Sequence, residues 1–125
     1  MFENTKAFSG FAADDLEKAR GFYADTLGLR TEVLDEGNLI ALHIEGGTDI
    51  LVYAKPDFVP ATYTILNFPV EDVEAAVDEL ASRGVTFERY EGFDQDEKGI
   101  ARGKGPAIAW FKDPVGNILA VLEQP

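Results

Sequence analysis

The chain of 125 residues contains no cysteine, and this absence excludes several kinds of site. Without cysteine there is no disulfide, no thiolate metal ligand and no cysteine nucleophile. Such a composition is compatible with a reducing compartment. Histidine is nearly absent as well, because His43 is the only one in the chain.

Positive charge is also scarce, with 11 Lys and Arg residues against 23 Asp and Glu residues. The formal net charge of −12 would repel a phosphate backbone, so we expect no nucleic-acid partner. We interpret the acidity as a contribution to solubility. No apolar run approaches the roughly 18 residues that a membrane helix needs. The first six residues do not read as a signal peptide, so we expect a cytoplasmic protein with no membrane partner.

What the sequence does contain is an internal repeat. Residues 13–19, around Asp15-Leu16-Glu17, return in similar form at residues 70–76. Residues 47–56 return at residues 116–125, at the end of the chain. A repeated segment that cannot bury its apolar face alone commonly packs against its other copy. The length predicts one domain over residues 1–125, made of unit 1 (about 1–56) and unit 2 (about 61–125).

Hydrophobic periodicity predicts the order β-α-β-β-β in each half, which is an α+β fold. In the first half we expect a helix that Asp14 or Asp15 caps and that ends near Leu27, before Gly28. The expected strands there are 5–12, 30–34, 39–44 and 50–54. In the second half we expect a helix at 72–82 and strands at 62–68, 85–90, 106–111 and 117–123. Asp113-Pro114-Val115-Gly116 predicts a type I turn that joins a hairpin.

One segment, Glu91–Lys104, breaks the symmetry, because it is longer than its counterpart and rich in glycine and charge. Loops of this length are commonly functional. A solvated surface loop is an equally good interpretation, and the role of the segment stays open at this point.

The residues Asp15-Leu16-Glu17-Lys18-Ala19, Phe22-Tyr23, Leu27-Gly28-Leu29 and Asp113-Pro114-Val115-Gly116-Asn117 resemble the vicinal oxygen chelate superfamily. This superfamily includes glyoxalases, bleomycin resistance proteins and extradiol dioxygenases. The resemblance implies two tandem units that form half-barrels around a central cavity, and commonly a homodimer. Catalytic members hold a divalent metal there, with one ligand from the first and one from the last strand of each unit.

The repeat locates these four ligand positions at Phe8 and Leu51 in the first half and at Ile65 and Ala120 in the second. All four residues are apolar, and the adjacent positions offer at most a hydroxyl group. Divalent metals draw their affinity from imidazole, thiolate or carboxylate ligands. We therefore expect no metal site of the family kind and no cofactor.

The alternation of side chains along a strand then predicts which residues line the cavity. Tyr53, Tyr63, Asn67 and Asp49 would supply the polar groups, and Trp110 joins from the strand that follows the long loop. A core or interface position for Trp110 is at least as good an interpretation. The full predicted set is Phe8, Gly10, Asp49, Leu51, Tyr53, Tyr63, Ile65, Asn67, Trp110 and Ala120.

Three functions are compatible with this sequence. The first is a metal-independent protein that binds or sequesters a small apolar or aromatic ligand, with Glu91–Lys104 as a possible lid. The second is a metal-independent or diverged lyase, isomerase or dioxygenase-like enzyme, for which His43 and Tyr53 are the weak catalytic candidates. The third is an interaction domain whose cavity is filled by its own side chains.

Overall fold

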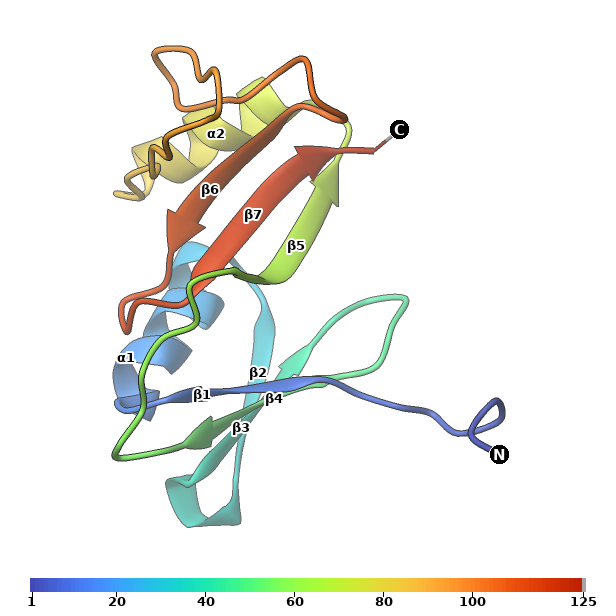
Figure 1. The fold of residues 1–125 in the computed structure, drawn as a ribbon. Helices are drawn as coiled ribbons and strands as arrows, with labels where there is room; N and C mark the ends of the chain where they lie inside the picture. Colours follow the sequence, from blue (N-terminus) through green and yellow to red (C-terminus); the bar gives the residue numbers. More distant parts are fainter. Residues whose placement is uncertain (125) are drawn as a thin grey trace. The chain divides into compact units, whose positions relative to one another are not determined.

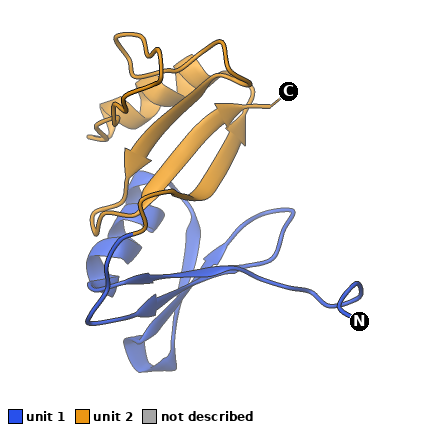
Figure 2. Ribbon diagram, viewed as in Figure 1, with its two compact units in different colours: residues 1–60 blue, residues 61–125 orange. Residues whose placement is uncertain are grey.

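The computed structural model describes residues 1–124 and divides the chain into two compact units, Met1–Pro60 and Ala61–Pro125 (Figure 2). Pro125, the last residue of the repeated segment, lies outside the described residues. Both units contain one sheet and one main helix, so the predicted α+β fold of two tandem units is confirmed (Figure 1).

Unit 1 folds into a four-stranded sheet with the strand order β1-β4-β3-β2. β1 runs parallel to β4, whereas β2, β3 and β4 are antiparallel neighbours. The elements are β1 (Gly10–Ala13), α1 (Leu16–Gly21), the π-helical turn η1 (Phe22–Thr26), β2 (Arg30–Leu34), the short 3-10 turn η2 (Asp35–Gly37), β3 (Leu39–His43) and β4 (Ile50–Ala54). The first strand is shorter than the predicted range 5–12, because residues before Gly10 form no continuous ladder with β4.

The helix of unit 1 begins at an aspartate, as its sequence predicts. The carboxylate of Asp15 accepts a hydrogen bond from the backbone N–H of Lys18 at 3.1 Å, which satisfies one of the unpaired donors of the first turn. Behind the sheet, Ala19 and Tyr23 are fully buried and the ring of Tyr23 lies 5.8 Å from that of Phe11. Gly28 ends the turn with φ of 75°, a value that favours glycine.

Unit 2 contains a three-stranded sheet with the order β5-β7-β6. Its elements are β5 (Thr64–Val70), α2 (Val73–Ser82), β6 (Ile108–Lys112) and β7 (Ile118–Glu123). Asp72 caps α2 by accepting from the N–H of Ala75, and the carboxylate of Glu123 accepts from the N–H of Val73. Val73 and Val77 of α2 are buried, so this helix covers one face of the sheet.

The strand predicted at 85–90 is not formed, and the sequence prediction is wrong there. Only Phe87 bridges β6, opposite Phe111, and Ala101 occupies the next part of the same edge, opposite Ile108. The side-chain amide of Gln95 bonds the carbonyl of Glu88 at 3.0 Å, so this carbonyl is not free for a ladder. The segment therefore follows β6 only briefly.

The Asp113–Gly116 turn and its hairpin are confirmed. The N–H of Gly116 donates to the carbonyl of Asp113 at 3.1 Å, Gly116 has φ of 100°, and β6 pairs antiparallel with β7. The buried carboxylate of Asp113 accepts from the backbone N–H groups of Val115 and Asn117 and from the side chain of Asn117. These residues of the sequence motif thus stabilise a turn.

Among the described residues no helix is both long enough and apolar enough to cross a bilayer.

Candidate functional site

The two predicted ligand positions of unit 1 lie beside a wide, shallow depression. Phe8 precedes β1 in a segment that runs next to β4, since the carbonyl of Ser9 accepts from the N–H of Leu51 at 3.1 Å. The depression measures about 370 Å³ and is lined by Lys6, Phe8, Thr48, Asp49 and Leu51. The Phe8 side chain is 63% exposed, which makes it an apolar surface at which a ligand could pack.

Gly10 and Tyr53, which belong to the same predicted site, flank Leu51 on this sheet. Gly10 pairs with Leu51, and a Cβ atom at Gly10 would lie only 3.1 Å from the Leu51 carbonyl oxygen, so glycine permits the close approach of the two strands. Tyr53 is two residues beyond Leu51 and therefore shares its face. Its side chain is 45% exposed.

His43 has two carboxylate neighbours in unit 1. Its Nδ1 atom lies 3.0 Å from Oδ2 of Asp49, and its Nε2 atom lies 3.5 Å from Oε1 of Glu32. The His43 side chain is 30% exposed, whereas those of Asp49 and Glu32 are more exposed. The sequence indicated His43 and Asp49 as separate candidates, and the structure brings them into contact.

Glu32 was missed by the sequence reasoning, although the register of the sheet contains the signal. Ala41 pairs with Glu32 across β2 and β3, and His43 is two residues beyond Ala41 on the same face. Across β3 and β4, Leu42 pairs with Ile50, so His43 comes opposite Asp49. Two-residue alternation combined with both hairpin registers would have assembled the three residues.

The predicted residues of β5 do not alternate as expected. Thr64 pairs with Ile118 and Leu66 pairs with Leu119, so Ile65 is an extra residue at a β-bulge. Strict alternation from Asn67 back through Ile65 to Tyr63 therefore fails at this bulge. Asn67 itself pairs with Ala120, and its side chain is exposed, as is that of Tyr63.

The remaining predicted positions, Trp110 and Ala120, are cross-strand partners in unit 2 and are buried. They pack with Ala101, Ile118 and the partly buried Tyr90 and Ile108. The ring of Phe93 lies 4.8 Å from that of Trp110, and the ring of Tyr90 lies 5.5 Å from it. In this unit, side chains of the long loop and its approach thus cover the face on which Trp110 lies.

Tyr90 has an unusual environment. Its hydroxyl oxygen is buried and has no hydrogen-bond partner among residues 1–124. Burial raises the pKa of the Tyr90 phenol, and the nearby carboxylate of Glu88 raises it further.

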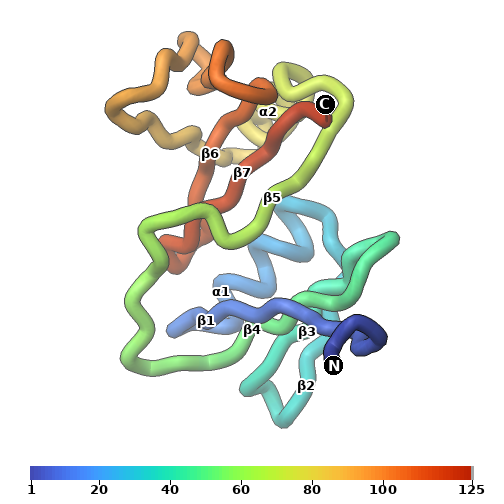
Figure 3. The backbone as a smooth tube through the Cα atoms, turned by 45° about the vertical axis from the view of Figure 1, so that its right-hand side comes forward, coloured from blue at the N-terminus to red at the C-terminus, as the bar shows by residue number. Residues whose placement is uncertain are grey.

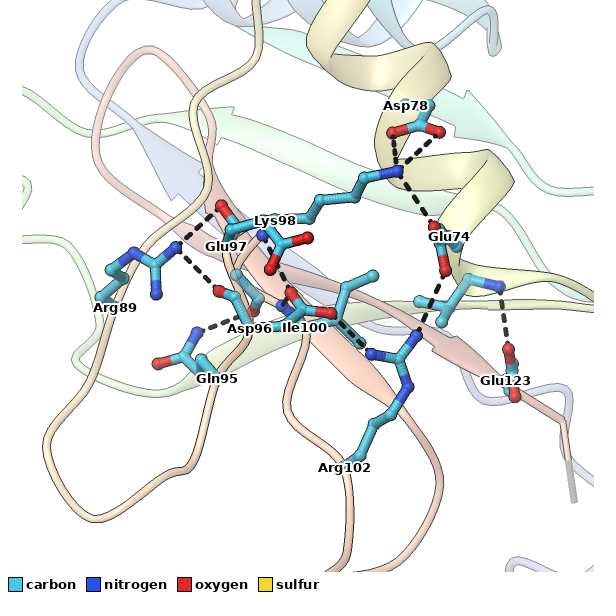
Figure 4. A network of polar contacts seen from close by, with 12 residues as sticks. Glu74, Asp78, Arg89, Gln95, Asp96, Glu97, Lys98, Ile100, Arg102 and Glu123 are labelled. Atoms are coloured by element: carbon cyan, nitrogen blue, oxygen red, sulfur yellow. Dashed lines mark hydrogen bonds and ion pairs between the residues drawn. The ribbon is translucent and has the colours of Figure 1, made fainter.

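The loop at 91–104 is tied to α2 and to itself by a polar network (Figure 4). Lys98 Nζ lies 3.1 Å from Glu74 Oε1 and 2.9 Å from Asp78 Oδ1, both on α2. Arg102 joins Asp96 at 2.6 Å. The tube in Figure 3 shows this loop beside α2, in agreement with these contacts. These contacts attach the loop to α2, and its role as a lid stays a prediction.

The described residues contain no group of three or more His, Asp or Glu side chains arranged to hold a metal ion. Around His43 the two carboxylates contact different ring nitrogens, so they do not converge on one point as metal ligands must. At the four positions implied by the family resemblance the donors are absent, and the residues present therefore do not fit that metal.

The comparison with known families decides the classification. The sequence profile of the Glyoxalase/Bleomycin resistance protein/Dioxygenase superfamily matches residues 8–121. The chain belongs to this superfamily. No curated protein sequence matches this superfamily member significantly.

Several solved structures share its fold. TnmS3, an antibiotic binding protein from Streptomyces sp. CB03234, has 22% sequence identity and a TM-score of 0.74, with coverage of 100% of this chain and 99% of that chain. A superfamily member from Sphaerobacter thermophilus DSM 20745 has 23% identity and a TM-score of 0.72, with coverage of 99% and 100%. Lactoylglutathione lyase from Agrobacterium tumefaciens has 23% identity and a TM-score of 0.62, with coverage of 96% and 93%. These likenesses establish a shared fold.

Proposed function

We propose that this protein binds a small apolar or aromatic molecule and does so without the metal of the catalytic superfamily members. The observation that carries the proposal is the exposed ring of Phe8 beside Leu51, at positions where a metal-dependent relative would present ligands. A mostly apolar surface with a few polar groups is the usual composition of a small-molecule site. Here Lys6, Thr48 and Asp49 supply the polar groups.

The structural likeness to TnmS3, described as an antibiotic binding protein, supports a binding role. At 22% identity this support concerns the scaffold, so the choice of ligand rests on the depression in unit 1. The lining there combines the exposed ring of Phe8 with the aliphatic side chain of Leu51. The exposed ring of Tyr53 lies on the same face of the sheet, two residues beyond Leu51. This surface favours a ligand with a flat apolar part.

Metal analysis of protein purified without chelators tests the first half of the proposal. We expect less than stoichiometric amounts of nickel, zinc, iron and manganese. A stoichiometric content of any of these metals would contradict a metal-independent site.

A titration with Nile red, a neutral aromatic dye, tests the second half. The variant Phe8→Ala should weaken dye binding about tenfold, which corresponds to about 1.4 kcal/mol. The matched control is Phe2→Ala, because Phe2 is 74% exposed and lies outside the depression. Equal affinities of the two variants would refute the assignment of the site.

Three further expectations belong to this proposal. A homodimer is proposed, and light scattering coupled to size exclusion tests it. A cytoplasmic location is proposed and can be tested by fractionation of the source cells. That the two units form one domain stays a prediction, which proteolysis at the linker of residues 56–60 tests.

An enzymatic use of the same face is the second candidate. One observation favours it, the 3.0 Å contact between His43 and Asp49. Among the chemistries left open by the sequence, this contact favours a metal-independent lyase or isomerase whose reaction begins with a proton transfer.

A further inference from the structure

The contact pattern of His43 gives its two ring nitrogens different roles. The Nδ1 atom lies 3.0 Å from Asp49 Oδ2, an ordinary hydrogen-bond distance. The Nε2 atom lies 3.5 Å from Glu32 Oε1, at the outer limit for such a bond. A neutral imidazole whose Nδ1–H donates to Asp49 keeps its lone pair on Nε2. In this tautomer the carboxylate of Asp49 would orient the ring and leave Nε2 able to accept a proton.

The surroundings of the ring also suit the cation that forms when Nε2 takes up a proton. The imidazolium would lie between the carboxylates of Asp49 and Glu32 and could donate to both. Arg30 is the direct cross-strand partner of His43 and is the nearby positive charge on β2. Two carboxylates against one guanidinium leave a local excess of negative charge around the ring.

Asp49 connects this pair to the proposed binding surface, because it also lines the depression with Phe8 and Leu51. A molecule that packs on Phe8 is therefore held next to the carboxylate that orients His43. Lys6 lines the same depression and offsets the negative charge of Asp49, so its lining carries no net charge. A neutral aromatic compound fits this site best.

We propose that His43, positioned by Asp49, is a general base that removes a proton from carbon in a small, neutral aromatic substrate bound at the proposed surface. Nε2 of His43 forms a bond to the proton, and the electron pair of the broken C–H bond stays on the substrate. That pair either forms a double bond as a leaving group departs from the neighbouring atom, or returns with a proton at another carbon. The first outcome is an elimination and the second is an isomerisation, and neither needs an oxidant.

The reaction of 5-nitrobenzisoxazole is a direct test. A base removes the single proton on the ring carbon next to nitrogen, the N–O bond breaks, and a coloured cyanophenolate forms without any co-reactant. At about pH 8 an ordinary imidazole is neutral and can act as the base. The wild-type protein should accelerate the reaction about 100-fold more than the same concentration of free imidazole.

The variant His43→Gln should lose this acceleration, a fall of about 100-fold in kcat/KM. Asp57→Asn is the matched control, because this exposed carboxylate of unit 1 pairs only with Lys55 among the described residues. The control should retain the wild-type rate. The proposal is overturned if the wild type does no better than free imidazole, or if His43→Gln reacts as fast as the wild type.

Asp49 is assigned as a positioning residue, so its test needs a readout beyond the rate. Since His43 is the only histidine, labelling with nitrogen-15 histidine gives the signals of one ring alone. The wild type should show the neutral tautomer with the proton on Nδ1, and Asp49→Asn should lose this preference and react about tenfold more slowly. An unchanged tautomer and rate in Asp49→Asn would remove Asp49 from the mechanism.

Binding and catalysis can fail separately in these experiments. His43→Gln leaves Phe8 in place, so the Nile red titration measures the binding surface in the absence of the base. Dye binding without elimination would overturn the catalytic proposal and retain the proposed binding function. Elimination that depends on His43 but not on Phe8 would overturn the proposed binding site and retain the catalytic proposal.

Discussion

The carboxylate of Asp96 holds the long loop together through several hydrogen bonds. Replacing it should therefore lower the free energy of unfolding. Asp96 accepts hydrogen bonds from the backbone N–H groups of Lys98 and Ile100, both at 2.9 Å, and it forms the 2.6 Å ion pair with Arg102. In Asp96→Asn the acceptor loses its charge, and the new NH₂ group cannot accept a bond. Hydrogen bonds to charged groups contribute about 1.5–3 kcal/mol each. Because the side chain is 29% exposed and Asn keeps one acceptor, we expect a loss of about 2 kcal/mol in the free energy of unfolding at pH 7.

The same substitution has a defined pH dependence. Burial raises the pKa of Asp96, but the hydrogen bonds from Ile100, Arg102 and Lys98 outweigh it and hold the pKa below the ordinary value of 3.8. The folded protein therefore binds this proton less readily than the unfolded chain. The stabilisation is complete above the unfolded pKa and is lost as the pH falls through the folded pKa. The difference between wild type and Asp96→Asn should thus be full at neutral pH and should shrink below about pH 4.

Urea denaturation at pH 7 and near pH 3 measures this difference. The control is Asp94→Asn in the same loop, because Asp94 is exposed and its side chain forms no hydrogen bond or ion pair within residues 1–124. The reasoning is refuted if the two variants are equally stable at pH 7. It is also refuted if the deficit of Asp96→Asn is the same at both pH values.

Three further substitutions have expected outcomes. Gly99→Ala should destabilise the protein by about 2–3 kcal/mol in urea denaturation, because Gly99 has φ of 86° and a Cβ atom there would lie 3.1 Å from that of Phe87. Gly103→Ala should lose only about 1 kcal/mol, since a Cβ atom there meets open space; an equal loss at both glycines would contradict the role of the contact. Tyr90→Phe should leave the melting temperature unchanged or higher, because it removes a buried hydroxyl without a partner among the described residues, and a clear decrease would show that the hydroxyl is bonded. Asp72→Ala should lower the free energy of unfolding by about 1 kcal/mol through loss of the α2 cap, and a change below the error of the denaturation curve would refute that role.

The elements that the sequence predicted well are those with local causes. Asp15 and Asp72 cap their helices through bonds to residues only three positions away, so the signal is contained in the motif. The Asp113–Gly116 turn is fixed in the same way by the carboxylate of Asp113 and the positive φ of Gly116. β4 begins and ends where its strand-like apolar run indicates, at Ile50 and Ala54.

The errors arise where distant residues compete for the same backbone. The expected strand at 85–90 is lost because Ala101 takes the position opposite Ile108 and Gln95 bonds Glu88. The sequence of residues 85–90 alone does not predict this competition. The bulge at Ile65 likewise depends on the register between β5 and β7.

In the candidate site, too, the sequence predicted what depends on local patterns and missed what depends on the pairing of distant strands. The repeat located Phe8 and Leu51 without a structure, and both line the depression in unit 1. The contact between His43 and Asp49 needed the register of β3 and β4, and Glu32 needed that of β2 and β3. Side chains that meet across three strands are difficult to select from one sequence, because each strand boundary must be correct at once.

Phe93 packs on Trp110 and therefore occupies the position in unit 2 at which an external aromatic ligand would contact Trp110. The loop presents the ring of Phe93 at 4.8 Å from that of Trp110, in the edge-to-face arrangement that aromatic pairs favour. Because Phe93 belongs to the same chain, its effective concentration at Trp110 is on the order of millimolar or higher. An external compound must displace this ring and the ion pairs of Lys98 that keep the loop on α2. Duplication of one scaffold has thus produced one sheet that contains an intramolecular occupant and another that presents its aromatic ring to solvent.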